Sequence, residues 1–138
     1  MRLSSSEARA RFASSRVARL ASVRPDGAPH VVPIVFALDG NVLYSVVDAK
    51  PKRTTSLQRL ANVTAEPRVG VLADEYAEDW TQLWWARGDG RAQIAADASE
   101  RAAALELLRA RYPQYRTVST DGPLLRIDID TWTGWSAS

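Results

Sequence analysis

The sequence predicts a mainly β (α+β) fold: a small antiparallel barrel, closed or split, of six or more strands with three short helices. From residue 17 onward, short β-prone runs alternate with turn residues. Most connections are too short to join parallel neighbours, so the strands must run antiparallel. Closing the sheet into a barrel would remove the exposed edges that it otherwise presents.

The composition is that of one globular domain covering residues 1–138, with 46% apolar and 25% charged residues. No apolar run is long enough to span a membrane, and the N-terminus lacks the apolar stretch of a signal peptide. We therefore expect a cytoplasmic protein without a membrane partner. The lack of cysteine and the single histidine exclude thiolate chemistry and argue against a metal site.

A helix and three strands are predicted in the first part of the chain. Ser4 and Glu7 have capping-box spacing, which predicts an amphipathic helix over residues 4–15. Three β-prone runs follow, at 17–23, 29–37 and 42–47. The Asp39-Gly40 dipeptide is a strong hairpin signal, and the three runs are expected to pair in chain order as a meander.

The second part is predicted to alternate helices and strands. The predicted elements are a helix from Thr54 or Thr55 that ends at Asn62, a strand over 68–73, a strand region over 82–95, a helix capped by Asp97 and running to about Tyr112, and a final strand over 125–130. The Asp89-Gly90 dipeptide leaves two alternatives for the region 82–95: two strands in a hairpin, or one bent strand with a glycine bulge.

The basic segment Lys50-Pro51-Lys52-Arg53-Thr54 is the best candidate for binding chemistry. The chain has 18 positive side chains but only two lysines, and both lie in this window. Ammonium, guanidinium and hydroxyl donors just before a helix suit a phosphate group, which also gains from the helix N-terminus. A solvated basic turn is the alternative that the residues alone leave open.

Five tryptophans lie after residue 79, and core packing is the simplest role for any one of them. Trp84 and Trp85 are adjacent in a predicted strand, so their side chains point to opposite faces. One of the two should therefore face a ligand, a partner or solvent. His30 alone supports no catalytic triad, and the acidic residues 74–79 are best explained as a solvated loop.

The order of these features resembles the pyridoxamine-phosphate-oxidase-like family. The resemblance rests on Pro29-His30-Val31-Val32-Pro33-Ile34, the Asp39-Gly40 hairpin, Val42-Leu43-Tyr44-Ser45, the Lys50–Arg53 segment, Pro67-Arg68-Val69 and Gly88-Asp89-Gly90-Arg91-Ala92. It covers essentially the whole chain. It implies an antiparallel six-stranded split β-barrel of the FMN-binding type with three flanking helices.

Within that family the short, Ala- and Arg-rich chain is most similar to the deazaflavin (coenzyme F420) branch. The resemblance implies a homodimer with cofactor sites at the subunit interface, and reduction of a small organic acceptor by hydride transfer. The implied cofactor-binding residues are His30, Val31, Val32, Pro33, Tyr44, Ser45, Lys50, Lys52, Arg53, Thr54, Trp85, Trp132 and Trp135. No catalytic residue is assigned, because Tyr44, His30 or water could each donate a proton to the product.

Two departures from the oxidase pattern argue against vitamin B6 oxidation. Pro29 and His30 occupy the place of an arginine in the ring-binding strand, and after Trp132 the chain lacks the oxidase's substrate-binding arginine and histidine. The alternatives to an F420-dependent enzyme are an FMN-dependent oxidase or reductase of the same fold, and a non-catalytic carrier of a flavin, deazaflavin or haem-like ligand. A nucleic-acid partner is not expected, because the net charge is only +2.

Overall fold

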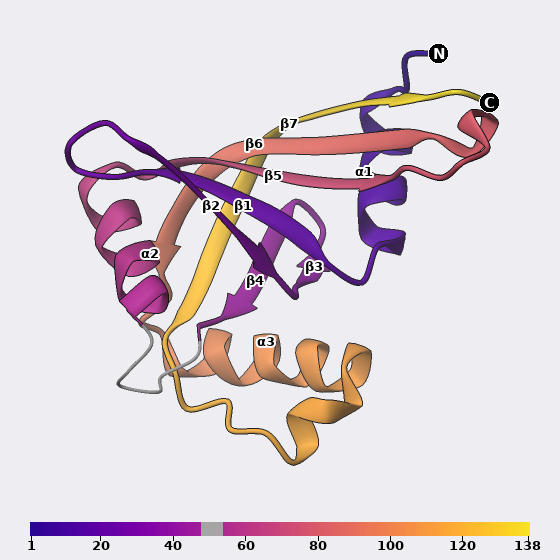
Figure 1. Ribbon diagram of the computed structural model, residues 1–138. Helices are drawn as coiled ribbons and strands as arrows, with labels where there is room; N and C mark the ends of the chain where they lie inside the picture. The colour runs from indigo at the N-terminus through magenta and orange to yellow at the C-terminus, as the bar shows by residue number, and fades with distance from the viewer. Residues whose placement is uncertain (48–53) are drawn as a thin grey trace.

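The computed structural model describes residues 1–47 and 54–138, in which seven strands and three α-helices are found (Figure 1). The elements are α1 (Ser5–Ser14), β1 (Ala18–Val23), β2 (Pro29–Ile34), β3 (Ala37–Asp39), β4 (Val42–Val46), α2 (Thr54–Ala65), β5 (Arg68–Glu75), the 3₁₀ turn η1 (Trp80–Gln82), β6 (Trp84–Ile94), α3 (Ala98–Arg111), the 3₁₀ turn η2 (Pro113–Arg116) and β7 (Leu124–Ser136). No helix in the described ranges is both long and apolar enough to cross a membrane.

The strands form one antiparallel sheet in the order β2-β1-β5-β6-β7-β4-β3. Its two edge strands, β2 and β3, are neighbours in the chain and are separated only by Val35 and Phe36. The sheet must therefore curl until its edges meet at this two-residue link. The edges do not pair with each other, so the structure is a split barrel, as predicted, with an open sheet rather than a closed one.

The predicted strand over 29–37 is wrong in one respect, because it is two strands. Its first part, β2, pairs with β1, and its last part, β3, pairs with β4 through the expected Asp39-Gly40 hairpin. The predicted meander is wrong for the same reason, since the second and third runs are not neighbours along their length. The break also raises the strand number from six to seven. Gly40 has a φ of +61°, which suits its place in the turn.

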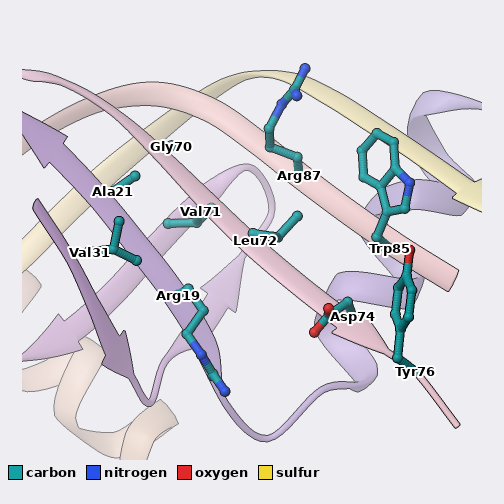
Figure 2. Close-up of a pocket in the computed structure, with 10 residues that line it drawn as sticks. All are labelled: Arg19, Ala21, Val31, Gly70, Val71, Leu72, Asp74, Tyr76, Trp85 and Arg87. Atoms are coloured by element: carbon teal, nitrogen blue, oxygen red, sulfur yellow. The ribbon is translucent and has the colours of Figure 1, made fainter. Parts of the chain in front are cut away.

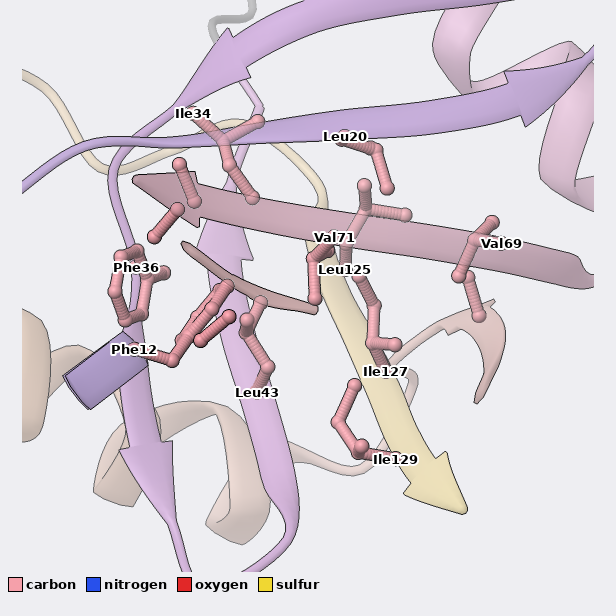
Figure 3. Packing of buried hydrophobic residues seen from close by; sticks show 14 of the residues in the cluster. Phe12, Leu20, Ile34, Phe36, Leu43, Val69, Val71, Leu125, Ile127 and Ile129 are labelled. Atoms are coloured by element: carbon pink, nitrogen blue, oxygen red, sulfur yellow. The ribbon is translucent and has the colours of Figure 1, made fainter. Parts of the chain in front are cut away.

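The interior of the curled sheet holds the main hydrophobic core (Figure 3). Inward-facing residues alternate along each strand, as Leu20 on β1, Val71 on β5 and Ile127 on β7 illustrate. Helix α1 adds Phe12, whose ring lies 4.8 Å from that of Phe36 between centroids. The capping box that begins α1 at Ser4 is present, as predicted.

A second, smaller core lies between α3 and the edge formed by β3, β4 and the start of β7. Leu105 and Leu108 of α3 pack there with Tyr44 of β4. The hydroxyl of Tyr44 donates to Oε2 of Glu100 at 2.7 Å, and Glu100 also pairs with Arg126. Burial, followed by this hydrogen bond, raises the pKa of Tyr44 to about 12. The polar network therefore fastens α3 to the sheet.

The region 82–95 contains one long strand, β6, and not a hairpin. The register shifts where Asp89 pairs with Thr131 and Gly90 pairs with Ile129, so the extra residue is Asp130 on β7. The final strand continues beyond the predicted 125–130 to Ser136, because β6 supplies pairing partners along its whole length.

Helix α2 does not end at Asn62, as predicted, but at Ala65. Asn62 is fully buried and its amide is used inside the fold: Nδ2 donates to Oγ of Ser22 at 3.1 Å, and Oδ1 accepts from Gln58 at 2.7 Å. A buried asparagine whose hydrogen bonds are satisfied by a neighbouring strand and by a side chain one helical turn earlier is compatible with a helix interior, although asparagine is usually found at helix ends.

We expect Gly90→Ala to destabilise the fold. A Cβ at this position would overlap the backbone carbonyl of Asp128, which cannot move without disturbing the β6–β7 pairing. The cost should be about 1–3 kcal/mol of unfolding free energy, measured by chemical denaturation. Gly70→Ala is the matched control, because the nearest atom to its Cβ would be 3.9 Å away. Equal stability of the two variants would contradict this account of Gly90.

We expect Tyr44→Phe to lower the unfolding free energy by about 0.5–1.5 kcal/mol at neutral pH, because the hydrogen bond to Glu100 is lost. The folded protein holds the phenol neutral to about pH 12, whereas the unfolded chain releases the proton near pH 10. Stability from this group is therefore complete below pH 10 and falls as the pH rises from 10 to 12.

The measurement is denaturant unfolding at several pH values. Tyr76→Phe is the control, since Tyr76 is 68% exposed. The unfolding free energy of Tyr44→Phe should fall less between pH 10 and 12 than that of the wild type, because the Tyr44 phenol is absent. An unchanged pH profile would disprove the raised pKa of Tyr44.

Candidate functional site

A groove of about 550 Å³ crosses the outer face of the four adjacent strands β2, β1, β5 and β6 (Figure 2). Its lining residues are Arg19, Ala21, Val31, Gly70, Val71, Leu72, Asp74, Tyr76, Trp85 and Arg87, and we call it the outer groove. Alternation along the strands explains most of its composition, because the residues next to them in the chain point to the inner face and fill the core. Val71 is itself a buried core residue that also borders the groove. The groove thus lies directly on the outside of the barrel core.

The floor of the outer groove is apolar and low. Ala21 and Gly70 are paired across β1 and β5, and neither carries a side chain larger than a methyl group. Val31 and Leu72 border this flat region, and both are solvent-exposed, Val31 at 61%. A flat apolar surface of this kind can receive a planar aromatic ring.

Charged groups stand at the sides of the floor. Arg19 rises from β1 on one flank and Arg87 from β6 on the other, while Asp74 lies near Tyr76 and Trp85 at one end (Figure 2). The Arg87 guanidinium lies 5.8 Å from the ring centroid of Trp85. Guanidinium groups beside an apolar floor favour an organic molecule that carries negative charge.

The predicted run on β2 divides between the two faces of the sheet. Val31 and Pro33 face outward, and Val31 lines the outer groove. His30 and Val32 face inward and are buried. Burial, and repulsion by Arg24 and Arg59, lower the pKa of His30 below its usual value.

The tryptophans divide in the same way. Trp84 is buried and Trp85 lies on the outer face, which confirms that the adjacent pair points to opposite sides. Trp135 pairs with Trp85 across β6 and β7 and is partly exposed. Trp132 lies in the core, 5.2 Å from the ring of Phe12, and its Nε1 donates to Oδ1 of Asn41. The structure therefore brings Val31, Trp85 and Trp135 to one face and places Trp132 on the other.

The remaining predicted residues lie away from the outer groove or outside the described ranges. Tyr44 packs beneath α3, and Ser45 is buried with its hydroxyl donating to the carbonyl of Val35 at 2.8 Å. The residues Lys50, Lys52 and Arg53 lie outside the described residues, and Thr54 is described only as the first residue of α2.

Several groove residues were not among those predicted from the sequence. Arg19 and Ala21 on β1, and Gly70 and Leu72 on β5, become neighbours only through the β1–β5 pairing. One local signal was available: a glycine inside a strand often marks a place where a ligand or another backbone comes close. Gly70 fits that description, since it lines the outer groove and an added Cβ would make only ordinary contacts, the nearest at 3.9 Å.

Known proteins share this architecture over nearly the whole chain. A FAD-binding protein from Mesorhizobium loti is 26% identical, with 97% of this chain and 95% of that chain covered and a TM-score of 0.74. A conserved hypothetical protein from Mycobacterium tuberculosis is 22% identical, with 98% and 86% covered and a TM-score of 0.79. The FAD binding protein from Mycobacterium smegmatis is 20% identical, with 98% and 96% covered and a TM-score of 0.67.

No curated protein matches the chain significantly. The family model described as Pyridoxamine 5'-phosphate oxidase, however, matches residues 4–136. This match spans all seven strands and all three helices of the described fold. The chain therefore belongs to the pyridoxamine 5'-phosphate oxidase family.

Proposed function

We propose that this protein is an F420-dependent oxidoreductase that transfers a hydride between a reduced deazaflavin and a small organic acceptor. Membership of the family indicates a flavin-related oxidoreductase, and the outer groove is the observation that carries the proposal. Its floor is apolar and flat around Ala21 and Gly70, and cationic side chains flank it. These residues fit a planar, negatively charged cofactor.

The chain's own residues bind and orient in this proposal. When bound, a reduced deazaflavin or flavin supplies the hydride. Val31, Leu72 and Trp85 would pack against the ring and keep water from its face, because they form the apolar walls of the groove. Arg19 and Arg87 would attract negative charge on the cofactor or the acceptor. No described residue needs to act as a nucleophile.

The phosphate of the cofactor is assigned to Lys50, Lys52 and Arg53 on the strength of the sequence. Ammonium and guanidinium donors ahead of a helix are well suited to a phosphate. Helix α2 does begin at Thr54, directly after this basic segment, which supports the proposal.

FMN is the second candidate cofactor. Two of the similar structures are FAD-binding proteins by name, which supports a flavin as the alternative. The same groove residues would serve an FMN-dependent oxidase or reductase. A non-catalytic carrier of a flavin, deazaflavin or haem-like ligand would use the same groove residues. It would differ from the two enzyme candidates only in having no acceptor to reduce.

The test is a parallel titration of the purified protein with F420, FMN and haem. We expect the tightest binding for F420, seen as quenching of its fluorescence, and oxidation of reduced F420 by an organic acceptor. A yellow protein that prefers FMN would replace the first candidate by the second. Tight binding without turnover of any acceptor would identify a carrier.

The same titration tests the phosphate assignment. The double variant Lys50→Ala/Lys52→Ala should bind the cofactor more weakly, by roughly 1.5–3 kcal/mol per charge-assisted hydrogen bond lost. Arg9→Ala, an exposed arginine on α1, is the control and should bind normally. Unchanged affinity in the double variant would remove the phosphate from this segment.

We further propose that a second copy of this chain covers the outer face and completes the site. Val31, Leu72, Tyr76 and Trp135 all lie there with large apolar areas in solvent. Soluble monomers rarely leave several such residues together on one face. Arg19 and Asp74 lie on the same face. Across a two-fold axis, the guanidinium of Arg19 in each copy would pair with the carboxylate of Asp74 in the other.

We expect Leu72→Glu to shift the protein from dimer to monomer in analytical ultracentrifugation, because a carboxylate would be buried in the interface. Leu107→Glu is a closely matched control: Leu72 is 37% exposed and Leu107, on α3, is 38% exposed. The control should remain dimeric. A wild-type protein that sediments as a monomer, or two variants that behave alike, would rule out this interface.

A further inference from the structure

A cluster of polar side chains lies on the inner side of the barrel beneath α2, opposite to the outer groove. Ser22 and His30 are directly paired across β1 and β2, so their side chains share the inner face. Asn62 of α2 donates to Ser22 at 3.1 Å, which brings this helix over the pair. Arg59 lies three residues before Asn62, on the same side of α2. We call Ser22, His30, Gln58, Arg59 and Asn62 the inner polar cluster.

Two atoms of the inner polar cluster lack a hydrogen-bond partner. Nδ1 of His30 and Nε of Arg59 are both buried and are unpaired within the described residues. The Asn62 amide in the same cluster is already engaged with Ser22 and Gln58. Buried polar atoms are rarely left without a partner in native proteins, so each unpaired atom requires an explanation.

The charge around these two atoms is positive. Arg24, at the end of β1, and Arg59 both repel a proton on His30, and no acidic group among the described residues opposes them there. The neighbour that counteracts the effect of burial on Arg59 is the phenol of Tyr115, not a carboxylate. Nε of Arg59 is a donor, and Nδ1 of His30 becomes one when that nitrogen carries a proton. Together with the positive charge around them, these two atoms match an oxyanion as the missing partner.

We propose that the inner polar cluster binds a phosphate-type oxyanion, to which His30 and Arg59 donate hydrogen bonds through their unpaired nitrogens. This assignment gives His30 a role different from the contact with the cofactor ring that the family resemblance implies. It does not rest on the proposed hydride transfer, because the oxyanion can bind without any redox cofactor.

The single histidine makes the test direct, because its imidazole resonances in an NMR titration can come only from His30 once any affinity tag is removed. The pKa of His30 is measured in sodium chloride, sodium sulfate and sodium phosphate at equal ionic strength. The titration in chloride is the reference, because any salt screens the positive charges of the arginines and so changes the pKa of His30. Sulfate is used beside phosphate because its charge does not change over the pH range of the titration.

We expect sulfate and phosphate to raise the pKa of His30 by about one unit relative to chloride, since a bound anion stabilises the protonated ring. Binding of the oxyanion should correspondingly tighten as the pH falls through the pKa of His30. Coincident titration curves in chloride, sulfate and phosphate would overturn the proposal.

Variants of Arg59 separate a specific site from a general salt effect. In Arg59→Gln the pKa of His30 should be higher in chloride, because one repelling charge is gone, and sulfate and phosphate should no longer raise it further. Arg59→Lys should retain part of the response. Arg9→Gln, on α1 at the far end of the sheet, should behave as the wild type (Figure 1). A full response in Arg59→Gln would disprove the role of Arg59.

The dispersion of the amide resonances shows whether each variant is folded. If Arg59→Gln does not fold, the comparison of Arg59→Lys with Arg9→Gln carries the test, and equal responses in these two variants would disprove the role of Arg59.

A comparison of FMN with riboflavin, which lacks the phosphate, identifies the source of the oxyanion. A larger shift of His30 with FMN assigns the site to the phosphate of a flavin ligand. Equal responses, together with the sulfate and phosphate shifts, assign it to a free ion or to another phosphorylated molecule.

Discussion

The link between β2 and β3 is the constraint on which the rest of the structure depends. The two strands lie at opposite edges of the sheet, yet only Val35 and Phe36 separate them in the chain. Two residues span only about 7 Å when extended. The sheet therefore cannot be flat: it has to curl until its edges are adjacent. This curl creates an inside, which Phe36 and Phe12 fill, and an outside, on which the outer groove lies.

The strict alternation of side chains then decides what each strand contributes to the two sides. On β2, successive residues point to different sides: Val31 lines the outer groove, whereas His30 belongs to the inner polar cluster. On β6, Trp84 donates to Glu75 from the inner side and Trp85 stands in the groove. A shift of register by one residue would exchange every one of these roles, so the long β6–β7 pairing protects the site as well as the fold.

Family membership and the groove together support a cofactor-based function. The groove offers apolar walls flanked by arginines. In the proposed reaction such a surface would contribute orientation, exclusion of water and charge, and the cofactor would supply the hydride. The outer face also carries the apolar residues that a second subunit would cover, so cofactor binding and assembly would share one surface.

The sequence by itself determined the local structure. The caps at Ser4 and Asp97, the Asp39-Gly40 turn and the opposite orientation of Trp84 and Trp85 depend on neighbours in the chain, and all are found in the structure. The order of these features along the chain resembles that of a known family, and this resemblance predicted the split barrel.

The tertiary structure alone decided the features that depend on distant pairing. The division of residues 29–37 into β2 and β3, the extension of β7 to Ser136 and the burial of Asn62 each follow from partners far away in sequence. The groove itself joins residues of four strands, and Arg59 comes near His30 only because α2 packs over β1, the strand that pairs with β2. Local patterns set which way a side chain points, but only long-range pairing sets what it faces.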